Sequence, residues 1–92
     1  MQIIRDKKYL AELDTILEFI AKDNFSRAIK MLSEIDKRIG AIPNMPYKYR
    51  QSYYHDTQNI RDLIVKGYTL PYLIDEQKGI IVILDIFKWS QR

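Results

Sequence analysis

Five basic side chains in the second half of the sequence have the right chemistry to bind phosphate groups. They are Lys48, Arg50, Arg61, Lys66 and Lys88. Guanidinium and ammonium groups neutralise phosphate charge, so a cluster of them on one face could bind RNA. A solvated basic rim is the alternative interpretation, because an exposed run of charges says little about function by itself.

His55 is the single histidine of the sequence and the one ordinary side chain that titrates near pH 7. It could act as a general base, or it could be a turn residue beside Asp56. Cysteine is absent, so disulfides and thiolate zinc sites are excluded. Neither a glycine-rich phosphate loop nor a nucleophile elbow is present. We therefore expect no metal and no cofactor.

Four tyrosines and two basic residues fall within residues 47–54, which we call the tyrosine loop. Their rings could cover the core or bind a protein partner, two roles that tyrosine fills equally well. Stacking of RNA bases is a third role. Trp89 could likewise pack on the sheet or meet a partner. The candidates for contact with a target or partner are Tyr47, Lys48, Tyr49, Arg50, Tyr53, Tyr54, Trp89 and Arg92.

Hydrophobic residues recur at helical spacing twice within residues 6–40, which predicts two amphipathic helices. Asp6 can cap the first helix, and either Asp23 or Asn24 can cap the second. Gly40 fits the left-handed position just past the end of the second helix. Because the connection is so short, the two helices should form an antiparallel hairpin.

Three strands are predicted after an irregular stretch at 41–58, namely 60–66, 68–75 and 80–87. The last of these is nearly all apolar, as is typical of a strand covered on both faces. Pro71 cannot donate to a ladder, so we expect an edge or a bulge there. Arg61 and Asp85 interrupt apolar strands. They could face solvent, pair across the sheet, or, for Arg61, point into a functional groove.

These elements predict one small α+β domain spanning residues 1–92. A helical hairpin would pack on a mostly antiparallel sheet of three to four strands, the fourth being an N-terminal strand at Ile3 and Ile4. The net charge of +3 permits nucleic-acid or acidic-protein partners. No secretory signal or membrane-spanning run is visible, so we expect a cytoplasmic protein.

Five segments, in this order, resemble the RelE/ParE toxin family. Residues 13–28 resemble the first helix, its Asp-Asn joint and the alanine that opens the second helix. Residues 40–46 resemble the segment after that helix, with its proline. Residues 59–68 resemble an isoleucine-arginine strand that ends in glycine-tyrosine. Residues 70–75 and 80–87 resemble the last two strands of the family.

The resemblance implies the toxin of a bacterial type II toxin–antitoxin pair, held inactive by a cognate antitoxin that wraps over it. Such pairs are associated with plasmid stabilisation and stress responses. ParE-type members are thought to act on DNA gyrase, without a known hydrolytic site. RelE-type members cut messenger RNA on the ribosome. A degenerate, inactive binding module is a third possibility.

The positions that mark RNA-cleaving relatives are altered here. Thr69 stands where those relatives commonly carry an arginine, and Lys88-Trp89 stands where they carry histidine, tyrosine or arginine. This departure favours the ParE-type role. If the chain is nevertheless a ribonuclease, its catalytic candidates are Arg61, Lys66 and Lys88, which could stabilise phosphate charge.

Overall fold

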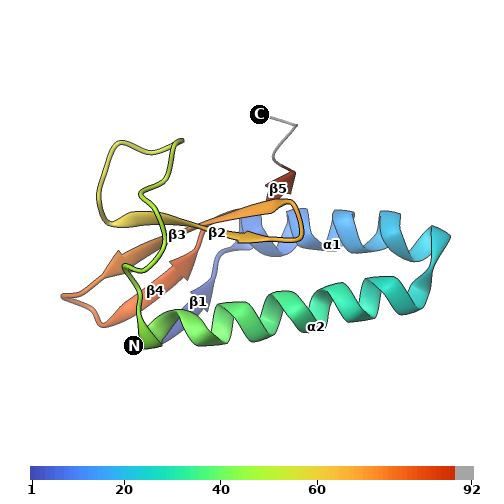
Figure 1. The fold of residues 1–92 in the computed structure, drawn as a ribbon, viewed down its shortest axis with the longest axis horizontal. Coiled ribbons are helices and arrows are strands. Elements are labelled where there is room, and N and C mark those ends of the chain that lie inside the picture. Colours follow the sequence, from blue (N-terminus) through green and yellow to red (C-terminus); the bar gives the residue numbers. More distant parts are fainter. Residues whose placement is uncertain (89–92) are drawn as a thin grey trace.

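The computed structural model describes residues 1–88, which form two helices and a sheet (Figure 1). In chain order the elements are β1 (Gln2–Arg5), α1 (Lys7–Asp23), α2 (Phe25–Ala41), the short 3-10 helix η1 (Ile42–Asn44), β2 (Ile60–Val65), β3 (Tyr68–Asp75), β4 (Ile80–Ile83) and β5 (Phe87–Lys88). The predicted α+β architecture, with a helical hairpin before the main strands, is confirmed.

A single residue separates the two helices. The side chain of Asn24 accepts from the backbone N–H of Arg27 at 3.0 Å, while its own N–H donates to the Ile20 carbonyl at 2.9 Å. Asn24 thus ends α1 and caps α2, which decides between the two predicted caps. Asp6 caps α1 as predicted, by accepting from the N–H of Lys8 at 3.1 Å.

The predicted role of Gly40 is wrong. Gly40 lies inside α2, which runs on to Ala41, and its φ is not in the left-handed region. The chain passes from Ala41 directly into η1, where Pro43 suits an opening turn because it needs no N–H donor there. The helix therefore ends by tightening into a 3-10 turn, and a glycine cap is not needed.

Neither of the two helices in residues 1–88 is long and apolar enough to span a membrane.

The described strands form one mixed sheet in the order β1-β4-β3-β2, with β5 beside β3 at the end of β4. The pairs β2–β3, β3–β4 and β3–β5 are antiparallel, whereas β1 runs parallel to β4. The N-terminal strand at Ile3 and Ile4 is confirmed. The sheet has one strand more than the three to four expected, because residues 80–87 do not form a single strand.

A break at residues 84–86 divides the predicted strand 80–87 into β4 and β5. The backbone N–H of Leu84 donates to the carbonyl of Pro71 at 2.9 Å. The nitrogen of Pro71 faces the same neighbour and has no hydrogen to return, so the ladder cannot continue. The irregularity expected at Pro71 therefore appears in the neighbouring strand. Asp85 lies in this break, and Oδ2 of its carboxylate forms an ion pair with Nζ of Lys8 at 3.0 Å.

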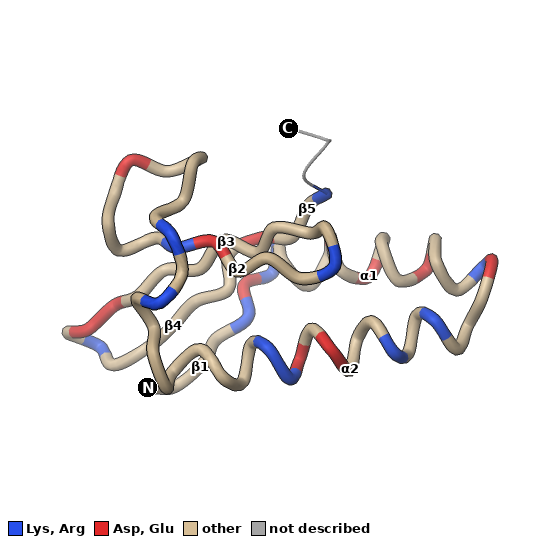
Figure 2. The backbone as a smooth tube through the Cα atoms, in the orientation of Figure 1, with Lys and Arg blue, Asp and Glu red and all other residues tan. Residues whose placement is uncertain are grey.

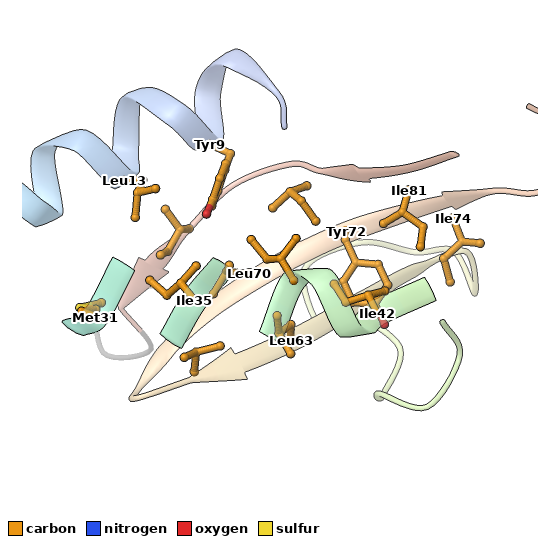
Figure 3. Close-up of a cluster of buried hydrophobic side chains, with 14 residues drawn as sticks. Tyr9, Leu13, Met31, Ile35, Ile42, Leu63, Leu70, Tyr72, Ile74 and Ile81 are labelled. Carbon is orange, nitrogen blue, oxygen red and sulfur yellow. The ribbon is translucent and has the colours of Figure 1, made fainter. Parts of the chain in front are cut away.

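The core lies between the helical hairpin and one face of the sheet, which we call the inner face (Figure 3). Alternation along the strands places Leu63, Leu70 and Tyr72 on that face, opposite Ile35 and Ile42 of the helical layer. In β4 only alternate residues are fully buried, so the expectation that this strand is covered on both faces is wrong. The opposite, outer face carries Asp62, Ile64, Thr69 and Pro71.

Candidate functional site

The tyrosine loop is attached to the free edge of β2. The N–H of Ser52 donates to the Ile60 carbonyl at 2.8 Å, and the N–H of Asp62 donates to the Arg50 carbonyl at 3.1 Å. These bonds flank an antiparallel bridge between Gln51 and Arg61. The loop therefore extends the sheet by a short additional pairing, and beyond it the chain rises away from the helices (Figure 1).

Arg61 holds this loop in place through backbone carbonyl groups. Its Nε donates to Gln58 at 2.9 Å, and its Nη1 donates to Tyr49 at 2.9 Å and to Tyr47 at 3.2 Å. The guanidinium also lies 5.0 Å from the centre of the Tyr47 ring. Arg61 does not pair with Asp85, which contacts Lys8 instead. The interpretation of Arg61 and Asp85 as a cross-sheet pair is therefore wrong, and the contacts of Arg61, which is half-buried, are those of a structural clamp.

The three catalytic candidates do not converge on one point. Lys66 lies in the turn between β2 and β3, and Lys88 pairs with Tyr68 at the same end of the sheet. Arg61 pairs with Tyr72, four residues further along β3, which is about 13 Å at the usual rise of a strand. Figure 2 shows the basic residues spread over the helices, the loop and the turn, without one dominant patch.

Arg50 anchors the loop to the outer face of the sheet. Its Nη2 lies 3.5 Å from Oδ2 of Asp62, and its guanidinium stacks 3.8 Å above the centre of the Tyr53 ring. The N–H of Tyr53 also points to Oδ2 of Asp62, at 3.4 Å. Asp62 is 1% exposed, so the fold buries a carboxylate under the loop. Burial of a charge is costly unless it is paired, which the Arg50 contact provides.

The sequence prediction missed Asp62 as a site residue. Its neighbours in β2 alternate, and Asp62 falls on the face away from the helices, where a polar residue of an antiparallel strand usually meets water. Only the loop folding over that face buries it. The available signal was the nearby Arg50, a potential ion-pair partner about one loop length away.

An open hollow of about 640 Å³ lies between the loop and the β2–β3 hairpin on the outer face. Its lining residues come from three short stretches of chain: Lys48, Tyr49 and Arg50 from the loop, Asp62 and Ile64 from β2, and Gly67 and Thr69 from the hairpin turn and β3. We call it the outer-face hollow. It brings Lys48 and Arg50 together with Thr69.

The tyrosines of the loop divide between two of the predicted roles. Tyr49 packs against the core, and the ring of Tyr54 meets Phe87 edge-on with centroids 5.1 Å apart. Tyr53 is 68% exposed although the guanidinium of Arg50 stacks on its ring, and Tyr47 is exposed as well. Core cover thus describes Tyr49, Tyr54 packs on Phe87, and Tyr47 and Tyr53 are exposed.

His55 is held by a turn of its own loop. Its Nδ1 lies 3.2 Å from Oγ of the buried Ser52, which in turn accepts from the N–H of Tyr54 at 3.2 Å. These contacts match the interpretation of His55 as a turn residue. No group of three or more histidine, aspartate and glutamate side chains within residues 1–88 could hold a metal ion. Trp89 and Arg92, two of the predicted contact residues, lie outside the described residues.

Comparison with known proteins gives matches over nearly the full sequence. A family model described as the ParE toxin of the type II toxin–antitoxin system, parDE, matches residues 3–92. A structure of a chromosomal ParDE toxin–antitoxin system from P. aeruginosa is similar with a TM-score of 0.75 and 18% identity, covering 96% of this chain and 95% of that one.

A second similar structure is a conserved hypothetical protein from Helicobacter pylori. Its TM-score is 0.52 and its identity 16%, with 99% of this chain and 97% of that chain covered. At these identities the two structures show a shared fold. A comparison with curated proteins gave no match.

Proposed function

Because the chain belongs to the ParE toxin family of type II toxin–antitoxin systems, we propose that it is a toxin that arrests growth by binding a large cellular target. The expected target is DNA gyrase, and the expected partner is a cognate antitoxin that neutralises the toxin in the cytoplasm. Binding, without hydrolysis, is the activity that the arrangement of side chains supports.

The observation that carries this proposal is the position of Arg61. Cleavage of RNA requires a base for the 2′-hydroxyl, charge stabilisation at the phosphate and an acid for the leaving oxygen. Arg61 is one of the candidates for charge stabilisation, and its Nε and Nη1 donate to the backbone carbonyls of Gln58, Tyr49 and Tyr47. Its distance along the sheet from Lys66 and Lys88 also argues against a common catalytic site.

Thr69 supports the same proposal. RNA-cleaving relatives commonly place an arginine at this position, but here the side chain is 0% exposed and uncharged. It adds no positive charge to the outer-face hollow. Binding of a protein target requires no such charge, so the altered position is compatible with a ParE-type toxin.

The antitoxin is expected to cover the sheet and the tyrosine loop. Tyr53 and Tyr47 are exposed there beside Arg50 and Arg61. Tyrosine and arginine are the residue types most often found at the energetic centre of protein interfaces. Co-purification of this chain with the protein encoded beside it tests this expectation, and separate elution at micromolar concentration would contradict it.

The target is tested by inducing this chain alone in bacteria and following the incorporation of labelled thymidine and labelled methionine over the first minutes. We expect thymidine incorporation to fall first, because inhibition of gyrase stops DNA synthesis before translation. Simultaneous induction of the antitoxin should restore both signals, which controls for the burden of expression. An earlier fall in methionine incorporation would instead support ribosome-dependent RNA cleavage.

A further inference from the structure

The helical hairpin carries a second set of apolar side chains beside the stripes that form the core. Within each helix its members are separated by three, four or seven residues, which keeps them on one side of that helix. They are Leu10 and Leu17 of α1 and Phe25, Ile29 and Leu32 of α2. Leu10, Phe25 and Ile29 are 47%, 70% and 51% exposed. Neighbouring apolar side chains that meet solvent together mark a surface that another molecule can cover.

These side chains border an open groove of about 500 Å³ between the two helices, which we call the hairpin groove. Its lining residues are Leu10, Ala11, Leu13, Asp14, Leu17 and Leu32. Phe25 and Ile29 precede Leu32 by seven and three residues, so they continue the same side of α2 towards the joint at Asn24. The groove is therefore apolar along the hairpin.

The two rims of the hairpin groove carry opposite charges. Asp14 and Glu18, one helical turn apart, are exposed on α1. Lys30 and Lys37 are exposed on α2, each two residues after a buried core residue and hence on the side away from the sheet. Figure 2 shows acidic segments along α1 and basic segments along α2. Within residues 1–88 no ion pair involves any of these four side chains.

We infer that the hairpin groove is the interface of a symmetric dimer of this chain. With the twofold axis along the helices, α1 of one copy lies over α2 of the other. The acidic rim of each copy then meets the basic rim of its partner. Glu18 and Lys30 are both six residues from Asn24, so they lie at one level of the hairpin and face each other between the copies.

The charges also select this arrangement over the other twofold packing of two hairpins. An axis across the helices would place α1 over α1, with the acidic rims together, and like charges at an interface are unfavourable. The inferred dimer is a four-helix bundle around an apolar centre. Because the groove lies on the side of the helices away from the sheet, the sheet and the tyrosine loop stay uncovered. The dimer therefore does not depend on the proposed function.

The size of the hairpin is enough for a dimer of moderate affinity. Each helix has 17 residues, which is about 25 Å, and two helices side by side are about 20 Å wide. One hairpin face thus covers about 500 Å², and two copies together bury about 1,000 Å², the lower limit of specific interfaces. We expect self-association in the micromolar range.

Sedimentation equilibrium of the full chain alone, between about 1 and 100 µM, measures the dimer. Glu18→Lys and Lys30→Glu each place like charges together at both symmetric contacts, so each should raise the dimer Kd about ten-fold or more. Mixed in equal amounts, the two variants should form a heterodimer with the Kd of the unchanged chain, because every contact then pairs opposite charges. An ion pair within one chain would not give this recovery on mixing.

Glu12→Lys is the matched control. Glu12 is also an exposed glutamate of α1, but it lines a different cavity, together with Phe19 and Phe87. The substitution changes the net charge by the same amount as Glu18→Lys, and the dimer Kd should stay within about two-fold of the unchanged value. Thermal unfolding of each variant at low concentration checks the fold, which exposed substitutions of this kind alter little.

Four results would overturn the inference. The first is a monomeric chain at about 100 µM, a concentration at which a micromolar dimer is formed. The second is a mixture of the two variants that stays monomeric. Equal weakening by Glu12→Lys and Glu18→Lys would assign the effect to net charge. A monomeric chain whose binding to the antitoxin is weakened by Glu18→Lys, but not by Glu12→Lys, would assign the groove to the antitoxin.

Discussion

The contacts of Arg61 are with backbone carbonyls of its own chain. Its guanidinium connects the carbonyls of Tyr47 and Tyr49 in the tyrosine loop to the carbonyl of Gln58, which lies just before β2. Substitution of Arg61 would remove these hydrogen bonds and allow the tyrosine loop to move. Tyr53 and Arg50, which the loop positions on the surface of the protein, would move with it. Loss of toxicity on mutation of Arg61 would therefore not identify a catalytic group unless stability were measured as well.

Arg61→Lys should lower the free energy of unfolding by about 2 kcal/mol, because an ammonium group cannot reach three carbonyls in the geometry of a guanidinium. Urea denaturation measures this change. The matched control is Arg38→Lys, since Arg38 makes one such bond, to the Ile64 carbonyl at 3.2 Å, and should lose less than about 0.5 kcal/mol. Equal stability of Arg61→Lys and the unchanged chain would contradict the clamp.

At the scale of the elements, the β2–β3 hairpin is closed by two residues in the left-handed region, Lys66 at φ 50° and Gly67 at φ 84°. Positive φ at both central positions is the geometry of the tight turn that matches the twist of two antiparallel strands. Glycine adopts it without cost, whereas the Cβ of Lys66 is crowded there. Lys66 therefore carries local strain beside Gly67, which lines the outer-face hollow.

Lys66→Gly should raise the free energy of unfolding by about 0.5 kcal/mol, the relief of strain being partly offset by the extra freedom of glycine in the unfolded chain. Lys66→Val is the opposite test, because a β-branched residue is poorly tolerated at positive φ. It should lower stability by more than about 1 kcal/mol. Both are measured by urea denaturation, and a stabilising valine would contradict the turn geometry.

The elements that were predicted correctly depend on local information. Asp6 and Asn24 cap the helices through hydrogen bonds to residues two and three positions away. The sequence around each helix start is therefore enough to predict these caps. The break between β4 and β5 depends on Pro71 in another strand and on Lys8 in a helix. No pattern within residues 80–87 encodes those contacts, and the apolar run therefore predicted one continuous strand.

The candidate site was only partly predictable for a similar reason. The tyrosine loop stood out by composition, and three of its residues, Lys48, Tyr49 and Arg50, line the outer-face hollow. Asp62 did not stand out, because the burial of Asp62 comes from a loop that folds over the strand. The clamp function of Arg61 was missed because its partners are backbone carbonyls, which the side-chain sequence does not reveal.

At the scale of the whole molecule, buried tyrosines set the alkaline limit of stability. Burial raises the pKa of Tyr9 to about 12, beside Asp36, whose negative charge acts in the same direction. Burial also raises the pKa of Tyr72, whose hydroxyl donates to the Pro46 carbonyl at 2.6 Å. Tyr9 lies in the helical layer and Tyr72 in the sheet. Folding therefore favours the neutral, protonated form of a tyrosine in each of the two layers.

Stability should accordingly be constant up to about pH 10, the pKa of an unfolded tyrosine. As the pH rises from there towards 12, the unfolded chain loses protons that the folded chain keeps, and the free energy of unfolding falls. Urea denaturation between pH 8 and pH 11 measures the slope. Tyr9→Phe should make it shallower, and an unchanged slope in that variant would show that Tyr9 ionises equally in both states.

The parallel pairing of β1 with β4 has a consequence for synthesis on the ribosome. Gln2 is made early, yet its partner in the sheet is Ile80, and pairings between such distant residues are the slowest to form. The helical hairpin and the β2–β3 hairpin can assemble from neighbouring residues while the chain is growing. A nascent chain that stops before residue 80 would keep one edge of β3 open and leave β1 without its strand partner. Premature termination would thus yield aggregation-prone fragments for proteolysis, and not a shortened active toxin.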